Sequence, residues 1–333
     1  MSRLNRLLLL LQPLTSKSFL YTLGVVYVLY MVVFMSFVYA PFLNSFQTTS
    51  EGISEHQSTA SINTVMSYWT PTHMLQASNL DQPVQTGSTA NGTQENSVPG
   101  AGKAVKQQGV APRDKSVHYP LSTVGKIFFT TASGRDSMCS GTAVKSDNQS
   151  TVDTAGHCLY YYGGWATNVI FCPLYNSGST PYGCWAARDL EVPSDWMDNA
   201  TNFHHDFGEA IVAPNSEGKL TDVVGGAGWA YNQPVNQPFY AYGYPAGYPF
   251  DGQTRQSCES PSSTLWQLAK GNVISIPCNM TGGSSGGPWF IQINGNLYLD
   301  GHNDFTSSMK IGHMFSPYYE TTWYDLYQKA QNS

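Results

Sequence analysis

Three side chains that can together perform nucleophilic catalysis occur in order along the chain: His157, Asp206 and Ser285. Ser285 lies within residues 281–289, TGGSSGGPW, where four glycines surround two serines. A serine attacks a carbonyl only when a base takes its proton, a third group holds that base, and N–H groups stabilise the oxyanion. Glycines allow the tight bend and the close approach that such a site needs. We therefore interpret Ser285 as a nucleophile, with the N–H groups of Gly283 and Ser285 forming the oxyanion hole.

Neither His157 nor Asp206 indicates a catalytic site when it is considered by itself. His157 follows a short strand-like stretch in TAGHC (154–158), and a lone histidine is more often structural than catalytic. Asp206 lies at the border of the apolar stretch DFGEAIV, where it could instead cap a turn. His204 and His205 suggest a metal, but no third ligand has a matching spacing, so we expect no metal site.

The stretches TAGHC and GGSSGGP resemble the histidine and serine motifs of the chymotrypsin-like serine proteases. The resemblance is greatest to the bacterial branch that includes glutamyl endopeptidases and related secreted trypsin-like enzymes, and it covers about residues 119–327. Supporting stretches are CSGTAV (139–144), DFGEAIV (206–212) and GYPAGYPFDG (243–252).

This resemblance implies an all-β fold of two packed six-stranded antiparallel β-barrels with the active site in the cleft between them. The first barrel would supply His157 and Asp206, and the second would supply Ser285. His157 would take the serine proton and pass it to the leaving amine, while Asp206 fixes the imidazole tautomer. The substrates would be proteins or peptides, and the reaction needs no metal or organic cofactor.

Two positions depart from the trypsin pattern. Ser284 stands where trypsin-type zymogens carry an aspartate before the nucleophile. Asn279, followed by Met280, stands six residues before Ser285, where an aspartate would select Arg or Lys substrates. The glutamyl branch uses a pocket histidine in the strand after the nucleophile, and His302 in LDGHNDF lies in that region. We therefore expect a substrate pocket with Asn279, Met280 and His302 and a weak preference for basic residues.

The cysteines indicate an oxidising compartment. All six lie between Cys139 and Cys278, and none forms the C-x-x-C spacing of zinc or thioredoxin sites. The family resemblance implies a Cys139–Cys158 disulfide. Proximity in sequence suggests Cys172–Cys184 and Cys258–Cys278 for the remaining pairs.

Strand-like runs recur at short intervals from about Tyr119 onward, which is typical of an all-β sandwich or barrel. Asn294-Gly295 predicts a hairpin turn. We expect barrel 1 over about 119–222 and barrel 2 over about 223–333. The runs are VGKIFFTT (124–131), GTAVKS (141–146), TNVIFCP (167–173), DFGEAIVAP (206–214), PFYAYGYP (238–245), GNVISIPC (271–278), GPWFIQI (287–293) and NLYLD (296–300).

The end of the chain has a different pattern. Trp323, Leu326, Tyr327 and Ala330 follow helical spacing. The spacing predicts a short C-terminal helix that packs on the β-rich body.

The N-terminal third predicts export. Residues 19–43 carry no charge over 25 positions, and Arg3, Arg6 and Lys17 precede them. This favours a transmembrane anchor with residues 1–18 in the cytoplasm, and a cleaved signal peptide is the alternative. Residues 44–118 are rich in Ser, Thr, Gln, Asn and Gly and predict a disordered spacer or a pro-segment. Residues 119–333 then form the protease domain outside the cytoplasm.

The overall charge and composition limit the alternatives. A net charge of -6 argues against binding nucleic acid. A catalytically silent binding module on the same scaffold would have lost at least one of His157, Asp206 and Ser285. A structural protein of the cell envelope leaves the glycine- and serine-rich loop unexplained. The oligomeric state stays open.

Overall fold

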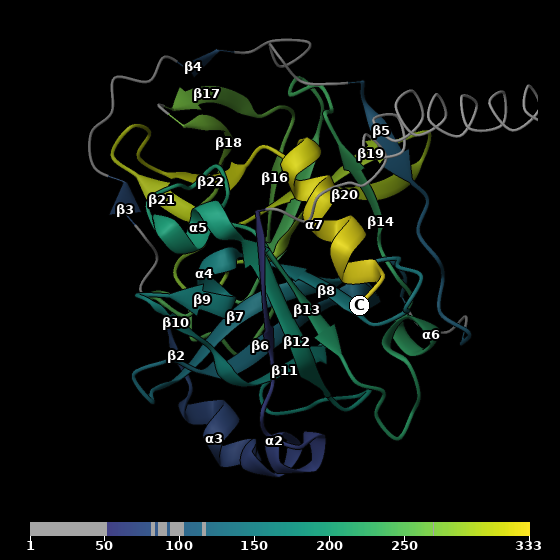
Figure 1. Ribbon diagram of the computed structural model, residues 1–333. Coiled ribbons are helices and arrows are strands. Elements are labelled where there is room, and N and C mark those ends of the chain that lie inside the picture. The colour runs from purple at the N-terminus through teal and green to yellow at the C-terminus, as the bar shows by residue number, and fades with distance from the viewer. Residues whose placement is uncertain (1–51, 81–83, 86–91, 94–102, 115–117, 269) are drawn as a thin grey trace, which may run out of the picture. The chain divides into compact units, whose positions relative to one another are not determined.

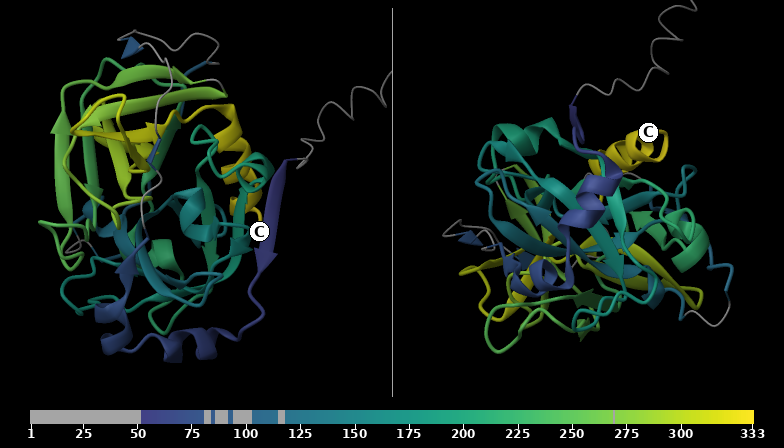
Figure 2. Two further views of the ribbon diagram at one scale, coloured as in Figure 1. Left: turned by 90° about the vertical axis from the view of Figure 1, so that its left-hand side faces the viewer. Right: turned by 90° about the horizontal axis from the view of Figure 1, so that it is seen from below.

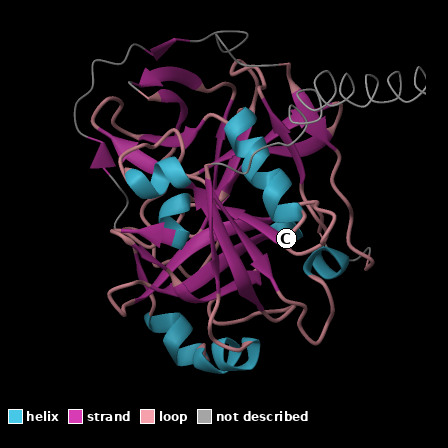
Figure 3. Cartoon of the chain, viewed as in Figure 1, coloured by secondary structure: helices cyan, strands magenta, loops and turns pink. Residues whose placement is uncertain are grey.

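The computed structural model describes residues 52–80, 84–85, 92–93, 103–114, 118–268 and 270–333. The expected cytoplasmic residues 1–18 and the apolar segment 19–43 lie outside the described residues. Within the described residues, no helix has both the length and the apolar character needed to cross a bilayer. The described chain consists mainly of β-strands, with a few short helices (Figure 3).

Six antiparallel strands of the first half close into a barrel. Their hydrogen-bonded order is β12-β11-β6-β7-β8-β13, and β13 pairs back with β12. The barrel encloses a core of fully buried apolar side chains that includes Ile127, Val152 and Trp185. The strands are β6 (Val124–Thr130), β7 (Asp136–Ala143), β8 (Thr151–Thr154), β11 (Thr167–Pro173), β12 (Trp185–Pro193) and β13 (Gly208–Val212).

The second half forms two sheets around a separate core that contains Ile274, Trp289 and Leu265. One sheet has the order β16-β15-β19-β20-β14-β5, and the other has the order β3-β21-β22-β18-β17-β4. The strands in chain order are β14 (Gly228–Tyr231), β15 (Phe239–Gly243), β16 (Gln256–Ser260), β17 (Thr264–Leu268), β18 (Gly271–Pro277), β19 (Pro288–Ile293), β20 (Asn296–His302), β21 (Phe305–Ser307) and β22 (His313–Pro317).

The expected all-β class is confirmed, with one closed six-stranded barrel in the first half. In the second half the strands pair within two sheets. The chain crosses from the barrel to these sheets between β13 and β14. Short helices occupy the connections: α4 (Gly156–Leu159), α5 (Ser194–Asp198) and α6 (Leu220–Val224).

Two local predictions are confirmed. Asn294 and Gly295 have φ values of 52° and 80° and join β19 to β20, which is the geometry of a tight hairpin turn with both central residues left-handed. Helix α7 (Thr321–Gln331) is the expected C-terminal helix. Its apolar face is fully buried, and the side chains on that face are Trp323, Leu326, Tyr327 and Ala330.

Three disulfides are formed in the described chain: Cys139–Cys158, Cys172–Cys184 and Cys258–Cys278. These are the pairs expected from the sequence. The first joins β7 to α4, and the third joins β16 to the residue after β18.

Residues 52–80 form ordered structure on the body. Strand β1 (Ile53–Gln57) pairs antiparallel with β12, and helices α2 (Ile62–Tyr68) and α3 (Pro71–Gln76) follow. Figures 1 and 2 show α2 and α3 at the bottom of the barrel, and α2 contacts β11 and β12. The disordered alternative for 44–118 therefore does not describe residues 52–80, because Val65, Trp69 and Met74 are buried against the barrel.

Shorter elements of the same N-terminal region pair with the body at other places. They are β2 (Ser78–Asn79), β3 (Val84–Gln85), β4 (Gly92–Thr93) and β5 (Val105–Gln107). Their partners are β7, β21, β17 and β14, respectively.

Candidate active site

His157 is positioned by a tight connection between β8 and α4. Strand β8 ends at Thr154, and the short helix α4 starts at Gly156. A Cβ on Gly156 would lie 3.0 Å from Asp206 Oδ1, so glycine leaves room for that carboxylate. The Cys139–Cys158 disulfide ties the next residue to β7. The imidazole is therefore held by rigid elements on both sides.

Asp206 orients the imidazole through two hydrogen bonds. Its Oδ2 lies 2.9 Å from His157 Nδ1, and its Oδ1 accepts a hydrogen bond of 2.7 Å from the backbone N–H of His157. Both side chains are fully buried. Since an ionised carboxylate can only accept, the Nδ1 atom carries a proton, and Nε2 presents its lone pair when the imidazole is neutral. Within the described chain Nε2 has no hydrogen-bond partner, which leaves it available as a base.

A second buried carboxylate lies beside this pair. Asp304 Oδ1 is 3.5 Å from His157 Nδ1, and neither oxygen of Asp304 has a hydrogen-bond partner among the described residues. Burial, and then the negative charge of Asp206, raise the pKa of Asp304 well above its ordinary value. For His157, burial lowers the pKa, but the Asp206 and Asp304 carboxylates more than offset this and raise it above its ordinary value of 6.5.

Ser285 lies in the loop between β18 and β19, and this loop touches the first barrel. The N–H of Ser140, in β7, donates to the Ser285 carbonyl oxygen over 2.7 Å. The same oxygen is 3.9 Å from Cys158 Sγ. A Cβ on Gly286, which has a φ of 78°, would collide with Thr154 at the end of β8. The glycines therefore allow the nucleophile loop to approach the two segments that flank His157.

Two N–H groups in this loop are left without an acceptor. The N–H groups of Ser284, Gly286 and Gly287 donate to carbonyl oxygens of the described chain. Those of Gly283 and Ser285 donate to none of the described residues. They are the two groups that the sequence predicts as an oxyanion hole, and such open donors are what a developing oxyanion requires.

Ser284 has a structural role. It is fully buried, and its hydroxyl donates to the Thr281 carbonyl oxygen over 2.8 Å. The neighbouring Gly243 would place a Cβ 2.8 Å from the Ser284 Cβ, so the space around this side chain is filled. The packing distinguishes Ser284 from the adjacent nucleophile candidate.

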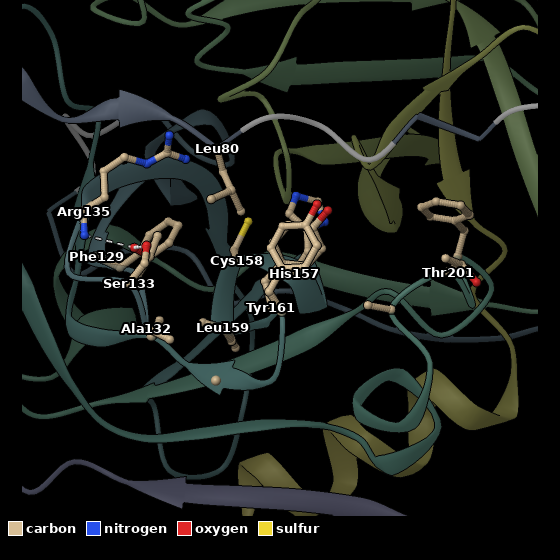
Figure 4. A pocket seen from close by; sticks show the side chains of 16 residues that line it. Leu80, Phe129, Ala132, Ser133, Arg135, His157, Cys158, Leu159, Tyr161 and Thr201 are labelled. Carbon is tan, nitrogen blue, oxygen red and sulfur yellow. Dashed lines mark hydrogen bonds between the residues drawn. The ribbon is translucent and has the colours of Figure 1, made fainter.

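A cavity of about 800 Å³ opens beside His157 (Figure 4). Its wall is mostly aromatic and aliphatic, with Arg135 as a charged group at one side. The principal lining residues are Leu80, Phe129, Arg135, His157, Tyr161 and Phe203. The volume falls within the range of about 300–1,000 Å³ that is typical of ligand-binding sites.

The three expected pocket residues are placed differently from one another. Asn279 is exposed, whereas Met280 is buried in the core of the second half. His302 is fully buried. Its Nε2 lies 3.0 Å from the carbonyl oxygen of Asp206, and its Nδ1 lies 2.8 Å from the Tyr319 hydroxyl. Both ring nitrogens of His302 are thus engaged inside the protein, where they support the backbone of Asp206.

Asp153 and Trp323 connect the residues behind Asp206 to the C-terminal helix. Asp153, at the β8 strand, accepts from the Tyr319 hydroxyl and from the Trp323 indole N–H, each over 2.8 Å. Helix α7 is thereby connected to the residues behind the candidate site. Sequence reasoning missed this connection and also missed Asp304. An acid in the short motif HNDF, following a β-strand and close to the expected pocket histidine, was the available signal.

The buried acids beside His157 are poorly suited to binding a metal ion. Among the described residues, His157, Asp206 and Asp304 offer ligand atoms within 4.8 Å of one another. However, the Nδ1 atom of His157 faces Asp206 as a donor and has no lone pair for an ion in that state. The arrangement suits proton transfer at Nε2 better than it suits metal binding.

Two solved structures of known proteases are similar to this chain. The protease Anisep from Arthrobacter nicotinovorans is 38% identical, with a TM-score of 0.58, and the alignment covers 65% of this chain and 99% of that protein. The thermostable serine protease AL20, from an extremophilic microorganism, is 39% identical, with a TM-score of 0.57 and coverages of 64% and 98%. The chain therefore belongs to the bacterial chymotrypsin-like serine proteases.

Curated relatives match over shorter segments. The glutamyl endopeptidase of Bacillus licheniformis is 28% identical over 155 residues, which is 45% of this chain and 45% of that protein. The extracellular metalloprotease of Bacillus subtilis is 28% identical over 133 residues, 40% of this chain and 37% of that protein. The chain thus spans less than half the length of these two relatives. No family model matches the chain.

Proposed function

We propose that the protein is an endopeptidase that hydrolyses peptide bonds through Ser285, His157 and Asp206. The observation that carries the proposal is the buried His157–Asp206 pair of 2.9 Å, whose outer nitrogen Nε2 is left without a partner. The two unpaired N–H groups of Gly283 and Ser285 support it. They supply the third component that acyl transfer needs.

In this mechanism the Ser285 hydroxyl attacks the scissile carbonyl carbon as His157 Nε2 takes its proton. The carbonyl oxygen becomes an oxyanion and accepts hydrogen bonds from the N–H groups of Gly283 and Ser285. The carbonyl then re-forms, the C–N bond breaks, and His157 gives the proton to the leaving amine. Water hydrolyses the resulting acyl-enzyme by the same steps in reverse, with Asp206 stabilising the imidazolium throughout.

The proposed cleavage preference rests on Asn279 alone, because Met280 and His302 are buried within the protein. A basic substrate side chain loses hydration in a pocket and needs a compensating charge. The neutral Asn279 offers hydrogen bonds but no such charge. We therefore propose a weak preference for Arg and Lys, with acidic or uncharged residues favoured.

We also propose that the catalytic part acts outside the cytoplasm. Its three disulfides support an oxidising compartment. The matched relative from Bacillus subtilis is described as extracellular. The uncharged residues 19–43, preceded by basic residues, would deliver the chain across the membrane as an anchor or as a cleaved signal peptide.

The test is covalent labelling by a fluorophosphonate probe, with Ser285→Ala compared to Ser284→Ala. We expect Ser285→Ala to abolish labelling and peptide cleavage while the melting temperature stays close to that of the native protein. Ser284→Ala should retain labelling, because the Ser284 hydroxyl only braces the loop. Labelling that persists in Ser285→Ala and vanishes in Ser284→Ala would overturn the assignment of the nucleophile.

A further inference from the structure

A fully buried lysine joins the first barrel to the loop that follows β15. Lys126, in β6, is 0% exposed. Its Nζ atom donates to the Gly252 carbonyl oxygen over 2.9 Å and lies 4.7 Å from the ring centres of Phe128 and Tyr175. Burial lowers the pKa of Lys126 to about 7, and the charge of Asp251 partly offsets that effect. Since a buried amine needs a hydrogen-bond partner, Gly252 supplies the acceptor that keeps Lys126 inside the protein.

Gly252 closes the loop of residues 244–252. Its N–H donates to the Pro245 carbonyl oxygen over 2.8 Å, which brings the two ends of this loop together. Gly252 has a φ of 73°, and a Cβ at this position would lie 2.8 Å from the Ala246 Cβ. Lys126 therefore binds the 244–252 loop at a point where the loop is tightly folded on itself.

The 244–252 loop also holds the peptide group between Gly282 and Gly283. The N–H of Ala246 donates to the Gly282 carbonyl oxygen over 2.7 Å. The carbonyl and the N–H of one trans peptide lie in a plane and point in opposite directions. A bond that fixes the Gly282 carbonyl therefore also fixes the direction of the Gly283 N–H, which is one of the two proposed oxyanion donors.

Two hydroxyl groups add further bonds between the same segments. The Thr281 hydroxyl accepts from the Gly247 N–H over 2.9 Å and donates to the Gly247 carbonyl oxygen over 3.0 Å. The Ser140 hydroxyl accepts from the Tyr244 N–H over 2.9 Å and donates to the Gly283 carbonyl oxygen over 3.0 Å. The peptide groups on both sides of Gly283 are thus attached, directly or through one hydroxyl, to a single loop.

We infer that Lys126 is a positioning residue for the oxyanion hole, whose Gly283 N–H it holds in place through the 244–252 loop. This inference rests on the proposed function. Without the bond from Lys126 the loop can shift, and the peptide between Gly282 and Gly283 shifts with it. A misaligned donor stabilises the oxyanion of the transition state less, while the uncharged carbonyl of the bound substrate depends on it little. Loss of Lys126 should therefore lower kcat and leave KM nearly unchanged.

The test compares two lysine-to-methionine substitutions in the full chain. Lys126→Met removes the donor and keeps a long side chain in the buried space. Lys145→Met, the control, removes a partly exposed amine that lies 3.5 Å from Asp147. Loss of a whole oxyanion donor costs about 10²–10³ in kcat, so a misaligned donor should cost about tenfold. We expect that loss in Lys126→Met and no change in Lys145→Met; a folded Lys126→Met with native kcat would overturn the inference.

Inhibition by a peptidyl trifluoromethyl ketone distinguishes the oxyanion hole from other parts of the site. The serine hydroxyl adds to the ketone carbon, and the resulting adduct carries an oxyanion like that of the transition state. The inhibition constant of Lys126→Met should therefore rise by about the same factor by which kcat falls. A lowered kcat with an unchanged inhibition constant would show that Lys126 acts on another step, and the inference would be wrong.

Labelling with a fluorophosphonate probe separates failure of this inference from failure of the proposed function. If the native chain is labelled and Lys126→Met matches its kcat, the positioning role is wrong and the protease assignment stands. If the native chain and both variants are neither labelled nor active, the proposed function is wrong and this inference falls with it. Should Lys126→Met not fold, Thr281→Val removes another attachment of the same loop; native kcat in a folded Thr281→Val would equally overturn the inference.

Discussion

Asp304 Oδ1 lies 3.5 Å from the Nδ1 atom of His157, the nitrogen that Asp206 Oδ2 approaches at 2.9 Å. Two buried carboxylates therefore face one imidazole, although a single carboxylate is sufficient to orient it. The hydrogen-bond distance identifies Asp206 as the orienting group. Asp304 is a nearby acid whose negative charge, when it is ionised, raises the basicity of His157.

The first prediction concerns the pH dependence of catalysis. His157 acts as a base only when neutral, and both carboxylates raise its pKa, so activity should rise with pH. Asp304→Asn removes one of the groups that raise the pKa. The acidic limb of the kcat/KM profile should therefore move to lower pH. A limb that stays in place or moves to higher pH would contradict the role of Asp304.

Stability gives an independent readout of the same substitution. The pKa of Asp304 is raised in the folded state, so the folded chain binds this proton more tightly than the unfolded chain. Stability then falls as pH rises from the unfolded pKa through the folded one. Asp304→Asn removes this loss. Its melting temperature, compared with that of the native protein, should improve as the pH is raised.

The second prediction concerns His302, whose Nε2 lies 3.0 Å from the Asp206 carbonyl oxygen. His302→Ala leaves that buried oxygen without its donor, which costs about 1–3 kcal/mol. Because His302 supports Asp206 without facing a substrate, kcat should fall while KM changes little. His302→Gln keeps an N–H donor and should recover part of the kcat. Equal losses in Ala and Gln would argue against positioning through this hydrogen bond.

The strands that the sequence predicts have a predominantly apolar pattern, such as β11 and β18. Strand β12 was missed because Arg188, Asp189 and Glu191 interrupt its pattern. In the structure Glu191 is fully buried and is paired with Lys329 and Ser333, which lie 138 and 142 residues away. A contact between such distant residues leaves no trace in local periodicity, so a buried acid has the appearance of a surface residue in the sequence.

Contacts between distant residues also explain why the sequence did not predict the ordered structure of residues 52–80 or the place of Asp304. Residues 52–80 carry too few apolar side chains to form a core of their own, and Val65 and Trp69 are buried only because the barrel provides the other surface. The motifs around His157 and Ser285 could be identified because catalysis requires these residue types in sequence. No comparable local requirement marks Asp304, which meets His157 only through the packing of the two halves.

The third prediction compares two disulfides that close loops of nearly equal length. The sequence separations are 19 for Cys139–Cys158 and 20 for Cys258–Cys278. The chain-entropy treatment assigns each about 3 kcal/mol, so replacing either pair by alanine should lower the melting temperature similarly. Cys158 directly follows His157, so the Cys139/Cys158 double variant should also lose kcat while folded. Equal kcat in the two folded double variants would contradict this.

The last prediction tests the cleavage preference. Asn279 is an exposed neutral residue six positions before Ser285, and Asn279→Asp adds a negative charge without changing the size of the side chain. If Asn279 lines the pocket, the variant should gain cleavage after Arg and Lys and lose any cleavage after Glu and Asp, because the new charge attracts one class and repels the other. The measurement is a peptide library cut by the native protein and by the variant. Glu217→Gln, a change of charge at an exposed residue far from Ser285 in the sequence, is the control and should leave the pattern unaltered. If the native protein already cuts almost only after Arg or Lys, Asn279 does not set the specificity, because a neutral side chain cannot supply the charge that such a preference needs.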